Sequence, residues 1–405
     1  MIPLEMAQAE VLGSCRPAAA VEVATSEALG LVLAAQVRAP EPVPSFRNTA
    51  MDGYAVHSDD VAGASPQAPV RLRVVGTRPA GTAGTISVGR GEALRIMTGA
   101  LFPDGADAVA IVEETRTDGD HVEILAPALP GVHIRPAGDD IEQGQLLFDA
   151  GTVLGPGHLG VLSSVGASAV RAFRAPVVGV LSTGDELVEA GVDLQAGQIR
   201  DSNRRTLLSL AQRDGFGVVD LGIARDDEVA IERALVRGAT VCDAILTSGG
   251  VSMGDFDYVK TVLDRIGKMS WMQVAIRPAK PFAFGRIGDT PVFGLPGNPV
   301  SSMVSYELLA RPGLRRIAGH VDSDLRRRAI RGFVAGQGWR GARDGRTTYV
   351  RVVAEFAADG KLKVSSSGGQ GSHQLYAMAR ANALAVTPPG LEIADGDPVD
   401  VLVLA

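Results

Sequence analysis

From Pro176 onward, short apolar runs alternate with longer segments in which apolar residues recur every three or four positions. The short runs predict buried strands, and the recurring spacing predicts helices. The strands are expected at 177–181, 218–222, 244–246 and 291–295, and the helices at 204–213, 228–237, 258–266 and 300–309. This alternation is typical of a parallel sheet with helices on both faces, in which ligands bind at the loops that follow the strands.

The rest of the chain follows other patterns. Residues 1–38 carry apolar residues at helical spacing, first around Val11 and again at 28–32, and end at a proline-rich stretch. Short strand-like runs between glycine, proline and aspartate clusters predict two small β units. We therefore expect an α/β plus all-β, multidomain chain. Its expected parts are a discontinuous mixed domain at 1–44 and 139–174, an inserted β domain at 45–138, a central parallel-sheet α/β domain at 175–322 and a C-terminal β-barrel-like domain at 323–405.

Composition agrees with several folded domains. Of the 405 residues, 46% are hydrophobic and 21% charged, which excludes a disordered chain. The formal net charge of −7 argues against general nucleic-acid binding, because that function requires an excess of Lys and Arg. Cys15 and Cys242 fit neither a disulfide framework nor a Cys-rich metal site. With no signal-peptide pattern and no long apolar segment, the expected location is cytoplasmic, without a membrane.

A glycine-rich segment follows the strand at 244–246. It reads Thr247-Ser-Gly-Gly-Val-Ser-Met-Gly254 and leads into a predicted helix. Gly249 and Gly250 allow backbone amides to converge on one point, and the helix start adds positive potential, so the segment is a natural anion cradle. A glycine turn that serves only the connection is the alternative.

The same segment also matches the Gly-x-Ser-x-Gly nucleophile elbow of hydrolases, with Ser252 at its centre. Ser252 comes after two glycines and is followed by two aspartates, whose charges oppose a developing oxyanion. A catalytic triad would also need a later histidine, and only His320 and His373 follow. We therefore prefer the anion cradle to the hydrolase.

Acidic residues follow three of the predicted strands. They are Asp185, Glu186, Asp226, Asp227 and Asp257. Because the carboxyl ends of parallel strands share one edge of a sheet, these carboxylates are expected beside the anion cradle. Hard Mg²⁺ prefers such oxygen ligands together with phosphate. The alternative is that each acid caps the helix that follows it.

A basic loop, Arg277-Pro-Ala-Lys280-Pro, joins two apolar runs. Its prolines stiffen a segment that holds two cations close together, which suits an oxyanion ligand. Two solvated charges are the alternative. The turn Leu295-Pro-Gly-Asn-Pro299 follows the last strand, so Asn298 and Ser301 can donate hydrogen bonds at the same edge of the sheet.

In their order and number, these segments resemble the molybdopterin molybdenumtransferases, the bacterial MoeA proteins related to the C-terminal part of gephyrin. The resemblance covers nearly the whole chain, and no single motif decides it. The motifs lie at 48–56, 95–99, 138–141, 182–187, 201–203, 248–252, 280–281 and 295–299. The resemblance implies that the α/β domain is of the molybdopterin-binding type.

The implied reaction inserts molybdate into adenylylated molybdopterin, with release of AMP and with assistance from Mg²⁺. The implied metal and catalytic residues are Glu186, Asp226 and Asp257, joined by Asp52 and Asp140. The family is a homodimer in which the N-terminal half of one subunit faces the active site of the other. The implied substrate-binding residues are Thr98, Ser248, Gly249, Gly250, Ser252, Arg277, Lys280, Pro296, Pro299, Ser301, Arg346, Arg351 and Ser372.

Three positions depart from the family pattern. Gln273 stands where some members carry Lys, Arg277 replaces Lys, and Thr348 stands where an acid is expected beside Arg346. The resemblance also suggests a molybdopterin adenylyltransferase and recipient molybdoenzymes as protein partners. A molybdopterin-binding or scaffold protein without turnover is the alternative to the enzyme.

Overall fold

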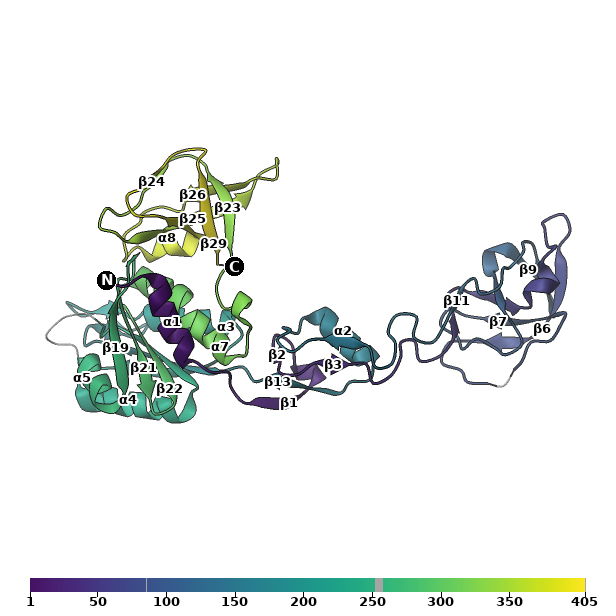
Figure 1. Ribbon diagram of the computed structural model, residues 1–405, viewed down its shortest axis with the longest axis horizontal. Coiled ribbons are helices and arrows are strands. Elements are labelled where there is room, and N and C mark those ends of the chain that lie inside the picture. The colour runs from purple at the N-terminus through teal and green to yellow at the C-terminus, as the bar shows by residue number, and fades with distance from the viewer. Residues whose placement is uncertain (85, 252–257, 405) are drawn as a thin grey trace. The chain divides into compact units, whose positions relative to one another are not determined.

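The computed structural model describes residues 1–84, 86–251 and 258–404 (Figure 1). The chain separates into two compact units. The main unit comprises Met1–Glu22, Gly30–Ala34 and Arg171–Ala405, and the inserted unit comprises Val23–Leu29 and Ala35–Val170.

The main unit contains a six-stranded sheet with the strand order β17-β14-β18-β22-β21-β19. Four strands are parallel, as predicted: β14 (Val177–Thr183), β17 (Gly217–Ala224), β18 (Ala244–Ser248) and β22 (Thr290–Leu295). The sheet continues through two antiparallel strands that were not predicted, β21 (Pro281–Ile287) and β19 (Lys268–Gln273). Strand β19 is mostly half-buried and mixes polar with apolar residues, so it lacks the apolar run of a central strand.

Helices cover both faces of this sheet, as predicted. On one face α1 (Leu4–Ser14), α3 (Asn203–Arg213) and α6 (Pro299–Ser305) share a core with Val178 and Val180 of β14. On the other face α4 (Glu228–Val241) and α5 (Tyr258–Ile266) pack with Leu181. Residues Val180 and Leu181 point to opposite faces because side chains alternate along a strand. The helix expected at 300–309 continues after α6 as a π-helical turn, η4 (Tyr306–Ala310), and as α7 (Arg311–Ile317).

The helical spacing at 28–32 predicted a helix that does not form. The structure has a short 3₁₀ turn, η1 (Thr25–Glu27), followed by strand β2 (Val32–Leu33). Between them Gly30 has φ +79°, a left-handed conformation that interrupts a helix. Strand β2 pairs with β13 (Ala169–Phe173) through Leu33 and Ala172.

The C-terminal strands close into a barrel, as expected. Strand β25 pairs with both β26 and β27, and β23 and β29 complete the ring. One further strand, β20, comes from the loop before β21 and pairs in parallel with β25. The bounds are β20 (Ile276–Arg277), β23 (Ala329–Val334), β25 (Thr347–Phe356), β26 (Leu362–Ser366), α8 (Leu375–Arg380), β27 (Ala383–Thr387) and β29 (Pro398–Val403).

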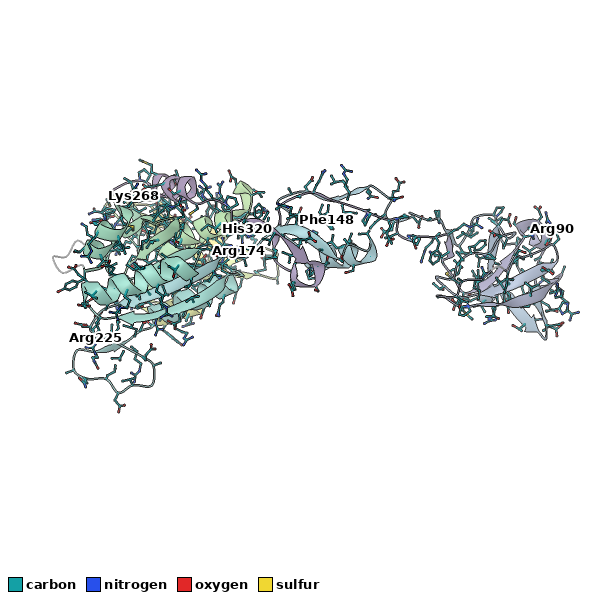
Figure 2. The ribbon with its side chains drawn as sticks, turned by 90° about the horizontal axis from the view of Figure 1, so that it is seen from below. Arg90, Phe148, Arg174, Arg225, Lys268 and His320 are labelled. Carbon is teal, nitrogen blue, oxygen red and sulfur yellow. The ribbon has the colours of Figure 1, made fainter. Side chains whose placement is uncertain are left out.

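The inserted unit contains a second six-stranded sheet, with the order β8-β5-β7-β6-β10-β9. Its strands are β5 (Gly53–Val56), β6 (Val70–Arg78), β7 (Glu92–Ile96), β8 (Ala108–Ile111), β9 (Thr115–Asp118) and β10 (His121–Ile124). The unit also contains α2 (Pro156–Ser164) and β12 (Leu146–Phe148). Phe148 of β12, labelled in Figure 2, packs against the His158 ring of α2 in a T-shaped arrangement with centroids 4.8 Å apart.

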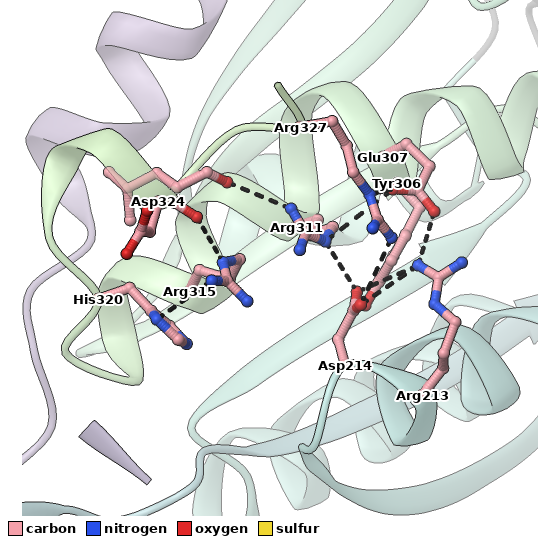
Figure 3. A network of polar contacts seen from close by, with 10 residues as sticks. Arg213, Asp214, Tyr306, Glu307, Arg311, Arg315, His320, Asp324 and Arg327 are labelled. Atoms are coloured by element: carbon pink, nitrogen blue, oxygen red, sulfur yellow. Dashed lines mark hydrogen bonds and ion pairs between the residues drawn. The ribbon is translucent and has the colours of Figure 1, made fainter. Parts of the chain in front are cut away.

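A buried ionic network, here called the Asp214 network, lies where α3 meets η4 and α7 (Figure 3). Asp214 follows α3 and faces Arg213, Arg311 and Arg327, and it accepts a hydrogen bond of 2.8 Å from the Tyr306 hydroxyl. The second carboxylate of the network, Glu307, is 2% exposed and lies 2.7 Å from Arg213 and 3.0 Å from Arg327. Both buried carboxylates of the network are therefore matched by arginines inside the protein.

Across 1–84, 86–251 and 258–404, no helix has both the length and the apolar character needed to cross a membrane.

Candidate active site at the carboxyl edge of the sheet

Two cavities lie beside the loops that follow the parallel strands. The first, here called the basic cavity, has a volume of about 430 Å³. Its lining residues are Arg277, Pro278, Ala279, Lys280, Pro281, Pro296, Asn298, Ser301, Arg346, Gln370, Gly371, Ser372 and His373. The structure thus brings together six residues that the sequence singled out for substrate binding: Arg277, Lys280, Pro296, Ser301, Arg346 and Ser372.

The Arg277–Lys280 loop is held by backbone contacts at both ends. Arg277 lies in β20, opposite Thr348 of β25, and the carbonyl of Lys280 accepts a hydrogen bond of 2.7 Å from the Val274 amide. Between them, the buried Ala279 has φ +79°, an unfavourable conformation for a residue with a side chain. Within the described residues, neither Arg277 nor Lys280 has a carboxylate partner. Both charges are therefore available to a ligand.

Arg346 differs from these two cations because it has its own acid. Its Nε and Nη2 atoms lie 2.9 and 2.6 Å from Oδ2 of Asp344, and these hydrogen bonds lower the pKa of that carboxyl. Thr348, which stands where an acid was expected, instead accepts a hydrogen bond of 3.0 Å from the Ala342 amide. Asp344 therefore supplies the acidic partner that the sequence analysis missed.

Arg351 does not line either cavity, although the sequence analysis placed it among the substrate-binding residues. It is 1% exposed, and its Nη2 donates to the carbonyls of Gly369 and Gly371 at 2.7 and 3.1 Å. Burial lowers the pKa of its guanidinium to about 10. Arg351 thus shapes the loop that carries Ser372.

The second cavity, here called the glycine-loop cavity, has a volume of about 330 Å³. It is lined by Thr183, Glu186, Leu187, Ile199, Arg200, Asp201, Ser202, Asn203, Ser248, Gly249, Gly297, Asn298, Pro299 and His373. Four predicted site residues are among them: Glu186, Ser248, Gly249 and Pro299.

The two glycines of the cradle have distinct roles. Gly249 has φ +94°, and its amide donates to the Leu295 carbonyl at 3.0 Å, which joins the loops after β18 and β22. Gly250 has φ +69°, and a Cβ atom there would lie 2.3 Å from Cβ of Val259. Only glycine fits at Gly250 without displacing α5. Ser252, the centre of the alternative nucleophile elbow, lies outside the described residues.

Asn203, the last residue of the 201–203 motif, is a further site residue that was not among the expected ones. Its Nδ2 donates to Oγ of Ser248 at 2.8 Å and to the Gly297 carbonyl at 2.6 Å. It therefore ties the glycine loop to the turn after β22. Its position is secured by Asp201, which accepts bonds from the Ser182 hydroxyl and from the Arg204 amide, both at 3.1 Å.

The acidic loops after β14 and β17 meet, as predicted for the end of a parallel sheet. The Asp185 amide donates to Asp226 at 3.4 Å, and the Asp226 amide donates to Asp185 at 3.2 Å. Asp227 is different, because it caps α4 by accepting from the Ala230 amide at 2.8 Å. The capping interpretation is therefore correct for Asp227.

The exposed carboxylates of Glu186 and Asp226 form no ion pair within the described residues. Oxygen donors of this kind fit Mg²⁺. The third predicted metal ligand, Asp257, lies outside the described residues. Among those described, no three His, Cys, Asp or Glu side chains are grouped to hold a metal ion.

In the inserted unit, two predicted site residues contact each other. Asp52 accepts hydrogen bonds from the amide and the hydroxyl of Thr98 at 2.6 and 2.7 Å. These bonds lower the pKa of the Asp52 carboxyl, which keeps it ionised. The exposed Asp140 is held through its backbone, since its amide donates to the Val43 carbonyl at 3.0 Å.

Comparison with known families places almost the whole chain. The description "MoeA N-terminal region (domain I and II)" matches residues 2–166, "Probable molybdopterin binding domain" matches 179–316, and "MoeA C-terminal region (domain IV)" matches 339–404. A "Molybdopterin molybdenumtransferase" of Haemophilus influenzae is 36% identical over 388 residues, covering 95% of this chain and 94% of that protein. This chain belongs to the molybdopterin molybdenumtransferase family.

Other members of the family agree. "Molybdopterin molybdenumtransferase 2" of Mycobacterium tuberculosis is 38% identical over 403 residues, covering 97% of this chain and 96% of that protein. The solved structure of a "molybdopterin biosynthesis moea protein" from Pyrococcus horikosii has a TM-score of 0.82 and 31% identity, and it covers 100% of this chain and 99% of its own. The fold of the family therefore extends over the whole molecule.

Two of the departures from the family pattern fall at different places in the site. Arg277 lines the basic cavity and keeps a positive charge there. Gln273 lies at the end of β19, where its carbonyl accepts a hydrogen bond of 2.8 Å from the Ile2 amide. It lines a neighbouring pocket with Trp271 and Phe282. That pocket shares Lys280 and Pro281 with the basic cavity, but Gln273 itself does not line the basic cavity.

Proposed function

We propose that this protein is the transferase that inserts molybdenum from molybdate into adenylylated molybdopterin and releases AMP. The observation that carries the proposal is a basic cavity beside a glycine loop at the carboxyl edge of a parallel sheet, with two cations that have no carboxylate partner in the part of the chain that the structure describes. Family membership makes this reaction the first expectation for the chain.

The basic cavity suits molybdate. A dianion loses hydration when it enters a pocket, and fixed cations and donors must replace that hydration. Lys280 and Arg277 supply the charge, and the Ser301 and Ser372 hydroxyls supply neutral donors. The compact ammonium of Lys280 suits a tetrahedral oxyanion, which offers no planar edge to a guanidinium.

The glycine-loop cavity suits the phosphates of the pterin substrate. The Ser248 hydroxyl lines this cavity and accepts from the Asn203 amide, so its own hydrogen can be donated to a phosphate oxygen, and Arg200 adds a positive charge. We assign Glu186, Asp226 and Asp257 to Mg²⁺, which when bound neutralises phosphate charge. These residues would orient the adenylyl phosphate for hydrolysis of the P–O–P link. The water oxygen bonds to one phosphorus and the bond from that phosphorus to the bridging oxygen breaks, so AMP and the pterin phosphate separate and a water proton is released.

The test is AMP release from adenylylated molybdopterin in the presence of molybdate and Mg²⁺. Wild-type protein should release AMP, and Asp226→Asn should lower the rate at least tenfold if one carboxylate of the metal set is lost, the scale expected from about 1.4 kcal/mol. Asp227→Asn is the matched control, because asparagine caps a helix as well as aspartate does.

The same assay decides between enzyme and scaffold. A non-catalytic molybdopterin-binding protein would bind the adenylylated pterin and molybdate but would release no AMP. No AMP from wild-type protein that binds both ligands would overturn the proposal.

We further propose a cytoplasmic homodimer in which Asp52, Thr98 and Asp140 of the inserted unit serve the site of the second subunit. The Asp52–Thr98 contact supports this, because it holds an ionised carboxylate on an exposed surface. Asp52→Ala protein mixed with Asp226→Ala protein should regain part of the activity through hybrid dimers with one intact site. A monomer in light scattering, or no gain in activity after subunit exchange, would contradict the homodimer.

A molybdopterin adenylyltransferase and recipient molybdoenzymes are the proposed protein partners.

A further inference from the structure

His373 occupies a special place between the two cavities. Among the described residues, only Asn298 and His373 line both the basic cavity and the glycine-loop cavity. Of these two cavities, Lys280 and Arg277 line the basic cavity alone, and Glu186 and Ser248 line the glycine-loop cavity alone. A side chain at this position can contact ligands in both.

The loop that carries His373 is held from three sides. The buried Arg351 bonds the carbonyls of Gly369 and Gly371, and Oε1 of Gln370 accepts a hydrogen bond of 2.9 Å from the Arg351 amide. The Val300 amide of α6 donates to the Ser372 carbonyl at 3.0 Å, which anchors the loop to the α/β domain. His373 is therefore presented from a fixed backbone.

The imidazole of His373 lies against Gly371. A Cβ atom at Gly371 would lie 2.9 Å from Cε1 and 3.2 Å from Nδ1 of His373. The ring can adopt this position because Gly371 has no side chain. A side chain at Gly371 would force the ring to shift.

Neither ring nitrogen of His373 has a hydrogen-bond partner within the described residues. Four other histidines do have one: His57, His121, His158 and His320. An imidazole carries two nitrogen atoms on different edges of the ring, and each can donate a hydrogen bond when protonated. The unpartnered ring of His373 is thus suited to two acceptors at once.

The charges around His373 favour an anion in the basic cavity, whereas an anion in the glycine-loop cavity depends on Mg²⁺ at Glu186. In the basic cavity it is joined by Arg277, Lys280 and Arg346, and Asp344 pairs with the last of these. In the glycine-loop cavity it is joined by Arg200 and by two acids, Glu186 and Asp201. Asp201 is already bonded to Arg204, and Glu186 belongs to the proposed metal set.

We propose that His373 is a binding residue shared by the two cavities, donating one ring N–H to molybdate and the other to the phosphate of the adenylyl group. This inference rests on the proposed function, which assigns molybdate to the basic cavity and the phosphates of the adenylylated pterin, the adenylyl phosphate among them, to the glycine-loop cavity. It predicts a signature that no residue confined to one cavity can produce, namely weaker binding of two different ligands.

The experiment measures the binding of sodium molybdate and of AMP with Mg²⁺, separately, by titration calorimetry on the full-length protein. His373→Ala should lower the affinity for each of the two ligands about tenfold, because each ligand loses one charge-assisted hydrogen bond. Lys280→Ala should weaken molybdate alone. His373→Gln keeps a single donor group, so it should lower the affinity for at most one of the two ligands by about tenfold.

Tyr376→Ala is the matched control, because Tyr376 lies three residues away on α8, is 78% exposed and lines neither cavity. It should leave both affinities unchanged. If His373→Ala alters only one affinity or neither while wild-type protein binds both ligands, the shared role is wrong and the proposed function stands. If wild-type protein binds neither ligand, the proposed function itself fails.

Discussion

The basic cavity and the Asp214 network both collect arginines, yet they treat charge in opposite ways. In the network, Arg213, Arg311 and Arg327 face the carboxylates of Asp214 and Glu307. In the basic cavity, Arg277 and Lys280 face no carboxylate among the described residues. The paired charges of the network stabilise the fold, whereas the charges of the basic cavity are available to bind a ligand.

Burial explains why the two regions differ. Glu307 is 2% exposed, and a charge at such depth must be matched inside the protein. Arg277 is exposed and Lys280 is partly exposed, so water compensates them until an anion enters. Substitutions in the network should therefore change stability, and substitutions in the cavity should change affinity.

The largest effect is expected for Glu307→Gln. It leaves Arg213 and Arg327 without a full counter-charge in a buried place, and breaking such a network costs about 3–5 kcal/mol. The free energy of unfolding in urea measures the loss. Glu232→Gln is the control, because Glu232 pairs with Arg265 at the surface and should cost about 0.5 kcal/mol or less. Equal losses for the two variants would contradict the comparison.

The next effect is a pH dependence caused by His320 at the edge of the network (Figure 3). Burial, reinforced by the charge of Arg315, lowers the pKa of His320 to about 4 from the ordinary 6.5. The unfolded chain therefore binds a proton that the folded protein excludes, so stability falls as the pH drops from 6.5 towards 4. The loss attributable to this residue is roughly 3 kcal/mol.

His320→Gln should remove that part of the pH dependence. Urea unfolding at pH 7 and at pH 4.5, for wild type and variant, gives the comparison. The decline between the two pH values should be smaller in the variant, and an identical decline would show that other groups cause it.

In the basic cavity, Lys280→Ala should raise the molybdate requirement about tenfold or more, since one charge-assisted hydrogen bond is worth roughly 1.5–3 kcal/mol. The free energy of unfolding should not change, because Lys280 has no internal partner to lose among the described residues. Binding of the adenylylated pterin should be barely altered. Lys268→Ala is the control, since Lys268 begins β19 at the opposite edge of the sheet from Arg225 and the strand-end loops (Figure 2).

The smallest effect should come from Asp344→Asn, which removes the negative charge that pairs with Arg346. Arg346 then loses the acid that now accepts its hydrogen bonds, and its full charge becomes available to the cavity. Molybdate should bind about threefold more tightly, on the scale of an exposed ion pair. Weaker binding would mean that Asp344 orients Arg346 rather than competing with the ligand.

Much of the main unit could be predicted because its strands are short runs of apolar residues that are contiguous in the sequence. The apolar runs of β14, β17, β18 and β22 located the parallel strands, and parallel strands place their following loops at one edge. That rule was enough to bring Asp185 and Asp226 together. The antiparallel strand β19 was missed because its side chains are mostly half-buried.

Other parts of the site depend on contacts between distant residues. The amide of Asn203 reaches Gly297, 94 positions along the chain, and no local pattern indicates such a bond. The acid beside Arg346 was expected at Thr348 but comes from Asp344, because the side chain folds back on its own turn. The place of His373 between two cavities requires the loop geometry set by Arg351.

Strand β20 has a consequence for how such a protein can be rearranged. Ile276 and Arg277 come from the segment of the α/β domain, yet they extend the sheet of the C-terminal barrel through Ile276–Thr347 and Arg277–Thr348 pairing. The position of one cation in the basic cavity is therefore set by the backbone of another domain. Exchange of the barrel for that of a distant relative would succeed only if the donor β25 accepts this borrowed strand in the same register. Because they share this strand, the two domains have to be exchanged together, although they follow one another along the chain.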